Sequence, residues 1–221
     1  MKKFLVGIIS LSLLLSSCKP HDVRLAERCL SSTVLIHMKV AKGTRRAEGT
    51  CSGVYVTPNL ILTADHCVDM SMEFSKDVYV KEIWIRNSYD RSARATVVKM
   101  SVVRDLALLK TDLKGNPVQL AKDIQVGEEC WVVGQPLGLQ FIVSKGIVSQ
   151  TNVPTFMFPV NHFITTATVL PGNSGGPAFN SKGQLIGIVT MSTSMLGSFG
   201  AAGLGIAVQI DEVRSFLRHV K

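Results

Sequence analysis

Ten short apolar runs, each bounded by turn residues, constrain the fold of this chain most. They are rich in Val, Ile and Thr, whose branched side chains favour extended backbone and pack well on a pleated sheet. Pairs such as Pro58-Asn59, Asn87-Ser88 and Lys182-Gly183 separate the runs, as turns do. We expect strands at 33–40, 60–64, 78–86, 95–103, 106–110, 130–134, 141–150, 162–167, 184–191 and 205–208. Many short strands at even spacing indicate an all-β sandwich or a pair of barrels.

One segment follows a helical period instead. In QIDEVRSFLRHV the apolar residues recur three and four positions apart, and Asp211 stands near the start, where a negative charge favours the helix dipole. We expect an amphipathic helix over about 209–220. The polar, turn-rich stretch 111–128 predicts a connector between two halves, about 33–115 and about 128–208.

The N-terminal residues have the pattern of an export signal. A basic start precedes an apolar run over residues 4–15, which is too short to span a bilayer as a helix. The next letters, LSSC, end at Cys18 and resemble the lipobox of bacterial lipoproteins, whose signal peptide is removed before a lipidated cysteine. An ordinary secretory signal with a chance cysteine is the alternative. We expect a signal peptide at 1–17, a lipid anchor at Cys18 on a bacterial membrane (periplasmic side or cell surface), and a tether and N-terminal segment over 18–32.

The charge balance is basic but does not indicate a nucleic-acid partner. The formal net charge is +8, and it falls to +6 when residues 1–17, with two lysines and no acidic residue, are removed. The basic cluster VAKGTRRAEG looks like the tip of a hairpin, and the aromatic platforms of nucleic-acid binders are missing. With 46% hydrophobic and 18% charged residues, the chain has the composition of a globular protein.

Four cysteines remain after Cys18. They are Cys29, Cys51, Cys67 and Cys130. An even number in an exported chain favours two disulfides, and four cysteines allow three pairings. Zinc is the alternative, but no C-x-x-C or H-x-x-x-H spacing occurs. We therefore expect disulfides and no metal.

The stretch PGNSGGP over 171–177 places one hydroxyl, that of Ser174, among three glycines and two prolines. Glycine allows positive φ and lets another backbone approach closely, so the stretch predicts a sharp turn. Such clusters mark ordinary turns more often than active sites. A functional reading depends on what else the chain supplies.

Two further stretches supply partners for this serine. LTADHC places His66 directly after a predicted strand, and RDLALLK places Asp105 at the start of another. A serine nucleophile needs a base within hydrogen-bond reach and a third group that fixes the tautomer of the base. Asp65 competes with Asp105 for the third position, but a neighbouring residue cannot easily fold back to the Nδ1 of His66. A carboxylate at Asp65 leaves the pH optimum open.

The order of TADHC, DLALL and GNSGGP resembles that of the trypsin/chymotrypsin-like serine proteases. VGQPLGLQFIVSKGIVSQ (133–150) and PGNSGGPAFNSKGQLIGIVT (171–190) are most similar to the HtrA branch, and the similarity runs from about Thr33 to Leu217. The resemblance implies an all-β fold of two antiparallel six-stranded barrels with a C-terminal helix. It also implies a serine endopeptidase that hydrolyses peptide bonds of polypeptide substrates through an acyl-enzyme, without a cofactor.

The resemblance assigns roles to individual residues. Ser174 is the nucleophile, His66 the general base and then acid, and Asp105 the carboxylate that orients His66. The backbone N–H groups of Gly172 and Ser174 form the oxyanion hole. The resemblance also pairs Cys51 with Cys67, as in the chymotrypsin branch, which leaves Cys29 and Cys130 for a second disulfide.

Substrate binding is expected at Thr168, Thr190, Met191 and Ser192. Thr168 stands six residues before the nucleophile, where trypsin-like enzymes carry the acid that binds Lys or Arg. None of the four is charged, so we expect a small or medium apolar residue before the scissile bond.

Two alternative functions remain open, and the chain differs from most HtrA proteins in one respect. An inactive pseudoprotease could use the same barrels as a peptide-binding module. A lipase or esterase would also use a serine triad, and its G-x-S-x-G elbow is matched by 172–176, but the alternating helices of that fold are missing. Most HtrA proteins carry a C-terminal PDZ domain, and because only 47 residues of this sequence follow Ser174, we expect none here.

Overall fold

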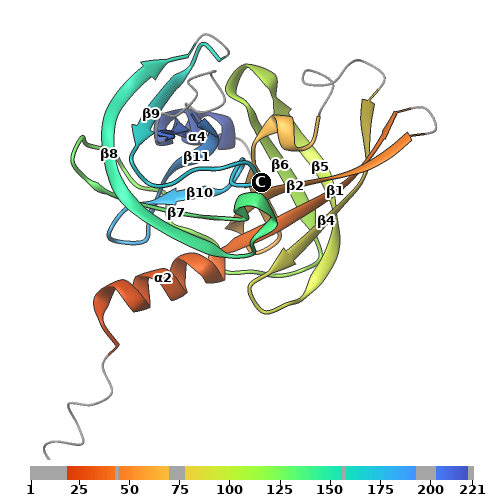
Figure 1. Cartoon of the computed structure of the whole chain (residues 1–221), viewed down its shortest axis with the longest axis horizontal. Helices are drawn as coiled ribbons and strands as arrows, with labels where there is room; N and C mark the ends of the chain where they lie inside the picture. Colours follow the sequence, from red (N-terminus) through yellow and green to blue (C-terminus); the bar gives the residue numbers. More distant parts are fainter. Residues whose placement is uncertain (1–18, 43–44, 70–77, 156–157, 193–202, 219–221) are drawn as a thin grey trace, which may run out of the picture.

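The chain folds into two closed antiparallel barrels of six strands each, which lie side by side (Figure 1). The computed structural model describes residues 19–42, 45–69, 78–155, 158–192 and 203–218. The predicted signal peptide and Cys18 lie outside these ranges. No helix among the described residues is long and apolar enough to cross a membrane. The expected pair of barrels is confirmed.

Each barrel has its own strand order, β1-β2-β3-β6-β5-β4 in the first and β10-β11-β12-β9-β8-β7 in the second. The first consists of β1 (Thr33–Lys42), β2 (Arg45–Thr57), β3 (Leu60–Thr63), β4 (Val78–Asn87), β5 (Ser92–Ser101) and β6 (Leu106–Thr111). The second consists of β7 (Glu129–Gly134), β8 (Ile142–Pro154), β9 (Asn161–Thr165), β10 (Pro177–Phe179), β11 (Leu185–Ser192) and β12 (Gly205–Gln209). Helix α4 (Ile210–Leu217) follows β12 and confirms the predicted C-terminal helix.

The sequence pattern predicts ten of these strands and misses β2 and β10. β2 contains Gly49 and Gly53, and glycine is a poor strand former. β10 is only three residues long and begins with Pro177, which cannot donate a ladder hydrogen bond. Both strands are set by their neighbours in the barrels rather than by a pattern of their own.

Apolar side chains fill both barrels and the space between them. On β6, Leu109 belongs to the core of the first barrel, while Leu108 packs in the cluster between the barrels. On β7, Val132 belongs to the core of the second barrel and Trp131 to the cluster between them. Because successive side chains of a strand point to opposite faces, strands at this contact are buried on both sides. The contact fixes the two barrels relative to each other.

Residues 21–32, within the predicted tether and N-terminal segment, form a helix. In α2 (His21–Ser32), Leu25 and Cys29 lie one turn apart and are buried in the cluster between the barrels. The guanidinium of Arg28 donates a hydrogen bond to the carbonyl of Lys182, 3.2 Å away. Helix α2 therefore docks on the second barrel (Figure 1).

One of the two expected disulfides is present. Cys51 on β2 is bonded to Cys67, whereas Cys29 and Cys130 are free and buried. Cys130 lies in the core of the second barrel, and Cys29 lies in the cluster between the barrels, to which the other face of β7 contributes Trp131. The expected Cys29–Cys130 disulfide is therefore wrong, because the barrel wall separates the two thiols. Burial raises the pKa of both thiols to about 12, so they are poor nucleophiles.

Candidate active site

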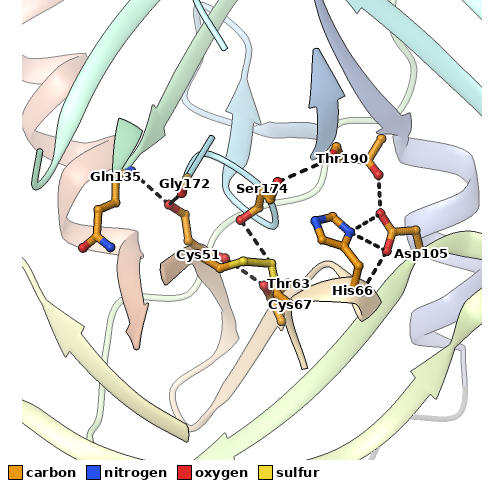
Figure 2. The surroundings of a disulfide bond; sticks show 10 residues. Cys51, Thr63, His66, Cys67, Asp105, Gln135, Gly172, Ser174 and Thr190 are labelled. Carbon is orange, nitrogen blue, oxygen red and sulfur yellow. Dashed lines mark hydrogen bonds and ion pairs between the residues drawn. A yellow bond between two sulfur atoms is a disulfide. The ribbon is translucent and has the colours of Figure 1, made fainter. Parts of the chain in front are cut away.

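Three chain segments bring His66, Asp105 and Ser174 together where the two barrels meet (Figure 2). His66 lies in a single 3₁₀ turn directly after β3, and Asp105 directly precedes β6. β3 and β6 are antiparallel neighbours, so the end of one and the start of the other lie together. Ser174 lies in the turn before β10, and its carbonyl accepts a hydrogen bond from the N–H of Ser52 on β2, 2.9 Å away. This bond holds the turn against the first barrel.

The imidazole of His66 is fixed by Asp105. Its Nδ1 lies 2.9 Å from each carboxylate oxygen, and the backbone N–H of His66 donates to Oδ1 at 3.0 Å. The hydroxyl of Thr190 donates to Oδ2, and the Asp105 side chain is 1% exposed. A carboxylate accepts only, so Nδ1 carries a proton and Nε2 is left as the basic nitrogen. Figure 2 shows the ring between Asp105 and Ser174, with its second nitrogen on the side of Ser174.

Asp105 adopts a backbone conformation that few side chains tolerate. Its φ is 51° and its ψ is 48°, and its N–H donates to the carbonyl of Val102, 3.1 Å away. Asp and Asn enter this left-handed region more readily than other non-glycine residues. The tight turn points the carboxylate back toward His66.

The sequence Pro171-Gly172 forms the turn that precedes Ser174. The N–H of Asn173 donates to the carbonyl of Leu170 at 3.0 Å, and Gly172 has a φ of 100°. Proline followed by a residue of positive φ is the signature of a type II turn. A Cβ on Gly172 would lie 2.1 Å from the carbonyl oxygen of Gln135. Both the turn and this close approach therefore require glycine at 172.

Two backbone N–H groups of the turn, those of Gly172 and Ser174, donate no hydrogen bond to any described residue. The carbonyls of the same peptide groups are both held. The carbonyl of Pro171 accepts from Leu137 N at 2.8 Å, and that of Asn173 accepts from Gly176 N at 2.9 Å. A trans peptide points its C=O and N–H in opposite directions, so each held carbonyl aims the N–H away from its partner. Two fixed, free N–H groups beside a serine can bind a developing oxyanion.

Asp65 is a second buried carboxyl beside His66. Its side chain is nearly inaccessible, and its Oδ1 has no hydrogen-bond partner among the described residues. Burial, with the negative charges of Asp105 and Asp69, raises the pKa of Asp65 to about 6. It does not hold the imidazole. It adds a negative charge next to His66 as the pH rises through 6.

We expect Asp65→Asn to move the acid limb of kcat/KM to lower pH, by about half to one unit. The ionised carboxylate favours the protonated, inactive imidazole, and asparagine removes that charge.

The folding stability should also depend on Asp65. The folded state keeps a proton on Asp65 that the unfolded chain loses between about pH 4 and 6, so wild-type stability falls as the pH rises through that window. Asp65→Asn should melt higher than wild type at pH 7.5 and equally at pH 4.

Profiles of kcat/KM between pH 5 and 9 and melting curves at the two pH values check this prediction. Asp123→Asn removes the same charge from an exposed position and serves as the control. An acid limb that moves equally in both variants, or in neither, would contradict the assignment to Asp65.

One group of described residues has the spacing of metal ligands. The donor atoms of Cys51, His66 and Cys67 lie within 4.8 Å of one another. The two sulfurs are bonded to each other, and the thiolate is the form of cysteine that binds metals. With the disulfide closed, the group does not offer a metal site.

The residues expected to bind substrate lie in different places. Thr168 lines a cavity of about 190 Å³ whose other walls are mostly apolar. They are formed by Pro136, Leu137, Leu139, Ile142, Ser144, Leu170 and Asn173. Met191 instead packs with Phe158 and Ile206, and Ser192 is buried on β11. The structure therefore does not bring Thr168 and Met191 to one described cavity.

Sequence reasoning missed the contacts of two residues at the site. Thr190 was predicted to bind substrate, but its hydroxyl also donates to the Asp105 carboxylate. Ser52 was not predicted at all, and its backbone N–H bonds the carbonyl of Ser174 while its side chain bonds Gly172 in the turn before Ser174. In the sequence, the one signal that Ser52 lies near the site is its neighbour Cys51, whose predicted disulfide partner, Cys67, follows His66.

Comparisons with known proteins agree with this geometry. A serine protease HtrA-like protein of Staphylococcus haemolyticus is 35% identical over 157 residues, which cover 64% of this chain and 24% of that protein. A probable periplasmic serine endoprotease DegP-like protein of Hahella chejuensis is 31% identical over 186 residues, 81% of this chain and 37% of that protein. The chain thus spans about a quarter to two fifths of the length of these relatives.

A solved structure has the same fold. The serine endoprotease from Yersinia pestis matches with a TM-score of 0.70 and 24% identity, over 90% of this chain and 66% of that one. The family model of the trypsin-like peptidase domain matches residues 51–188, more than half of the chain. The expected resemblance to HtrA-type proteases is confirmed, and the chain belongs to the trypsin-like peptidase domain family.

Proposed function

We propose that this protein is a serine endopeptidase with Ser174 as its nucleophile. The observation that carries the proposal is the position of the His66 ring, which Asp105 holds at Nδ1 while its other nitrogen faces Ser174. Membership of the trypsin-like peptidase family and relatives named as serine proteases support it. An alternating strand and helix pattern, which an esterase elbow would need, does not occur in the two barrels.

The chemistry follows from these contacts. At rest the Ser174 hydroxyl donates to the carbonyl of Thr190 at 3.3 Å. On attack at the scissile carbonyl, its proton passes to Nε2 of His66, and Asp105 stabilises the imidazolium. The free N–H groups of Gly172 and Ser174 bind the negative charge of the tetrahedral intermediate, and each such donor contributes about 3 to 4 kcal/mol. The imidazolium then protonates the leaving amine, and water hydrolyses the acyl-enzyme by the same steps.

Polypeptides with an apolar residue before the scissile bond are the proposed substrates. β10 pairs with β11 only as far as Ile188, so residues 190–192 extend beyond β10. An extended peptide could add there as a further strand. The apolar cavity lined by Thr168 and Leu170 lies beside the turn before Ser174 and carries no charged residue. We propose that it receives the apolar side chain of the substrate.

Cleavage of casein, with every cleavage site mapped by mass spectrometry, tests activity and preference together. We expect apolar residues to dominate the position before the cut, and Lys or Arg there would refute the proposed pocket. A fluorophosphonate probe should label Ser174. An unlabelled protein that still binds peptides would be the pseudoprotease, and turnover of esters without casein cleavage would indicate an esterase.

We further propose that the protein is exported and held at a membrane by a lipid on Cys18. The sequence LSSC supports this, as does the word periplasmic in the name of the Hahella chejuensis relative. Helix α2 begins at His21 and docks on the second barrel, so an anchor at Cys18 would hold the barrels close to the membrane surface.

Radioactive palmitate should label the wild type, and Cys18→Ala should lose both the label and the association with membranes. Cys29→Ala, which removes a buried thiol, is the control. Undiminished labelling of Cys18→Ala would refute the lipid anchor while leaving the peptidase proposal untouched.

A further inference from the structure

Ser52 on the first barrel makes four hydrogen bonds to described residues, and three of them reach residues of the second half of the chain. Its side chain is fully buried on β2. Its hydroxyl donates to the carbonyl of Gly172 at 2.9 Å and accepts from the N–H of Gln135 at 3.0 Å. Its own N–H donates to the carbonyl of Ser174 at 2.9 Å, and its carbonyl accepts from the hydroxyl of Thr63 at 2.8 Å. The direction of each bond is fixed, because carbonyls only accept and backbone N–H groups only donate.

The hydroxyl of Ser52 bonds the carbonyl of Gly172, the residue of the turn with the widest range of allowed backbone conformations. Gly172 must be glycine, because a Cβ would meet the carbonyl of Gln135. Glycine also populates several regions of φ and ψ, so the turn is held less firmly by its own Asn173–Leu170 bond than a turn without glycine would be. The peptide group between Gly172 and Asn173 is held by two bonds, from Ser52 to its carbonyl and from its N–H to Leu170. The Ser52 bond therefore fixes the peptide on one side of the Gly172 Cα, while the bond from Leu137 N to the Pro171 carbonyl fixes the peptide on the other side, which carries the Gly172 N–H.

The two oxyanion donors depend on Ser52 in different ways. The Ser174 segment is held by the backbone N–H of Ser52, which any residue other than proline would supply at position 52. The Gly172 carbonyl is held by the side chain alone. Loss of the hydroxyl removes one of the two bonds that flank Gly172 and leaves its N–H held by the Leu137 bond alone, so it should loosen the Gly172 donor and leave the Ser174 donor in place.

We propose that Ser52 is a positioning residue that preorganises the Gly172 N–H for the oxyanion; this inference rests on the proposed peptidase function. The first barrel thus sets the geometry of the oxyanion-binding turn through one hydroxyl. The benefit appears when negative charge develops on the substrate, because a preorganised donor needs no reorganisation at that moment.

Ser52→Ala is expected to lower kcat by about 10- to 100-fold, with KM changed less than about threefold. Complete loss of one oxyanion donor costs about 10² to 10³ in kcat, and a loosened donor should cost less. The Ki of a peptide boronate, whose tetrahedral adduct occupies the oxyanion site, should rise by the same factor as kcat/KM falls. The Kd of an uncleaved substrate peptide, measured in the Ser174→Ala background, should stay the same with and without Ser52→Ala.

Thr111→Val is the matched control for a merely structural role. The buried hydroxyl of Thr111 also donates to one carbonyl, that of Arg94 at 3.0 Å, and accepts from one N–H, that of Leu113 at 3.2 Å. It lies in the first barrel away from the turn. Thr111→Val should lower the melting temperature by a few degrees and leave kcat and the boronate Ki unchanged.

Ser52→Thr, which restores a hydroxyl, should recover kcat toward wild type. If Ser52→Ala does not fold, Ser52→Cys gives the same test, because a thiol is a much weaker donor. Unchanged kcat and boronate Ki in a hydroxyl-free variant would overturn the proposal, and so would a loss confined to KM. A wild-type protein without Ser174-dependent hydrolysis would instead refute the peptidase function itself.

Discussion

Ser174→Ala and His66→Ala are each expected to lower kcat by about 10⁶, and the double variant should be scarcely worse than either one. The two residues act as one unit, since the hydroxyl is a weak nucleophile without a base and the base has no proton to take without the hydroxyl. The residual rate should come from the N–H groups of Gly172 and Ser174, which remain in all three variants. Because the losses share one cause, they do not add.

Turnover of a peptide cut from a mapped casein site measures these losses. Ser92→Ala and His21→Ala change the same residue types at exposed positions and should keep wild-type kcat. Melting curves show whether each variant is folded. If the effects of Ser174→Ala and His66→Ala multiplied in the double variant, the two side chains would act in separate steps, contrary to the proposed mechanism.

The sequence contains most of the information for the barrels and for the three central residues. Continuous apolar runs predict strands here because each side chain faces a core or the contact between the barrels, as Leu108 and Leu109 do on adjacent positions of β6. His66 and Asp105 stand at strand ends, where the pairing of β3 with β6 brings them together. These residues can be predicted because each stands at the end of a strand that the local sequence pattern also predicts.

Other features depend on contacts that no local pattern carries. Helix α2 buries Leu25, Cys29 and Ser32 on one face, but the polar Ser32 and the small number of apolar residues obscure the helical period. The number of cysteines is even, yet Cys130 faces into a barrel and Cys29 lies outside it. Counting cannot show on which side of a strand a thiol lies.

The supporting hydroxyls are the least predictable part of the site. Thr190 bonds a carboxylate that precedes it by 85 residues, and Ser52 bonds a carbonyl that follows it by 120. Serine and threonine occur on many strands, where they are usually exposed or bond nearby backbone. Only the closed contact between the two barrels distinguishes these two from the rest.

Asp105→Asn is expected to lower kcat by about 10⁴ without unfolding the protein. An asparagine amide can turn its NH₂ toward Nδ1 of His66, which then has to accept, so the ring proton moves to Nε2 and the base is lost. The backbone N–H of His66 donates to Oδ1 of this carboxylate, and the hydroxyl of Thr190 donates to Oδ2. The asparagine side chain has one oxygen, so in either orientation of the amide it can accept only one of these two hydrogen bonds. Asp105→Ala should cost less than Ser174→Ala, because a misoriented imidazole keeps some basicity.

Comparison with Asp65 shows which carboxyl orients His66. Both carboxyls are buried, Asp65 next to His66 in the sequence and Asp105 next to its ring in space. Asp105 has two oxygens within 2.9 Å of Nδ1, whereas Oδ1 of Asp65 has no partner among the described residues. Asp65→Asn should therefore keep kcat within about tenfold of wild type at its own optimum and change mainly the pH profile. Single-turnover acylation of the two asparagine variants, both checked for folding, separates the assignments. An inactive Asp65→Asn beside an active Asp105→Asn would mean that Asp65, despite its geometry, orients the base.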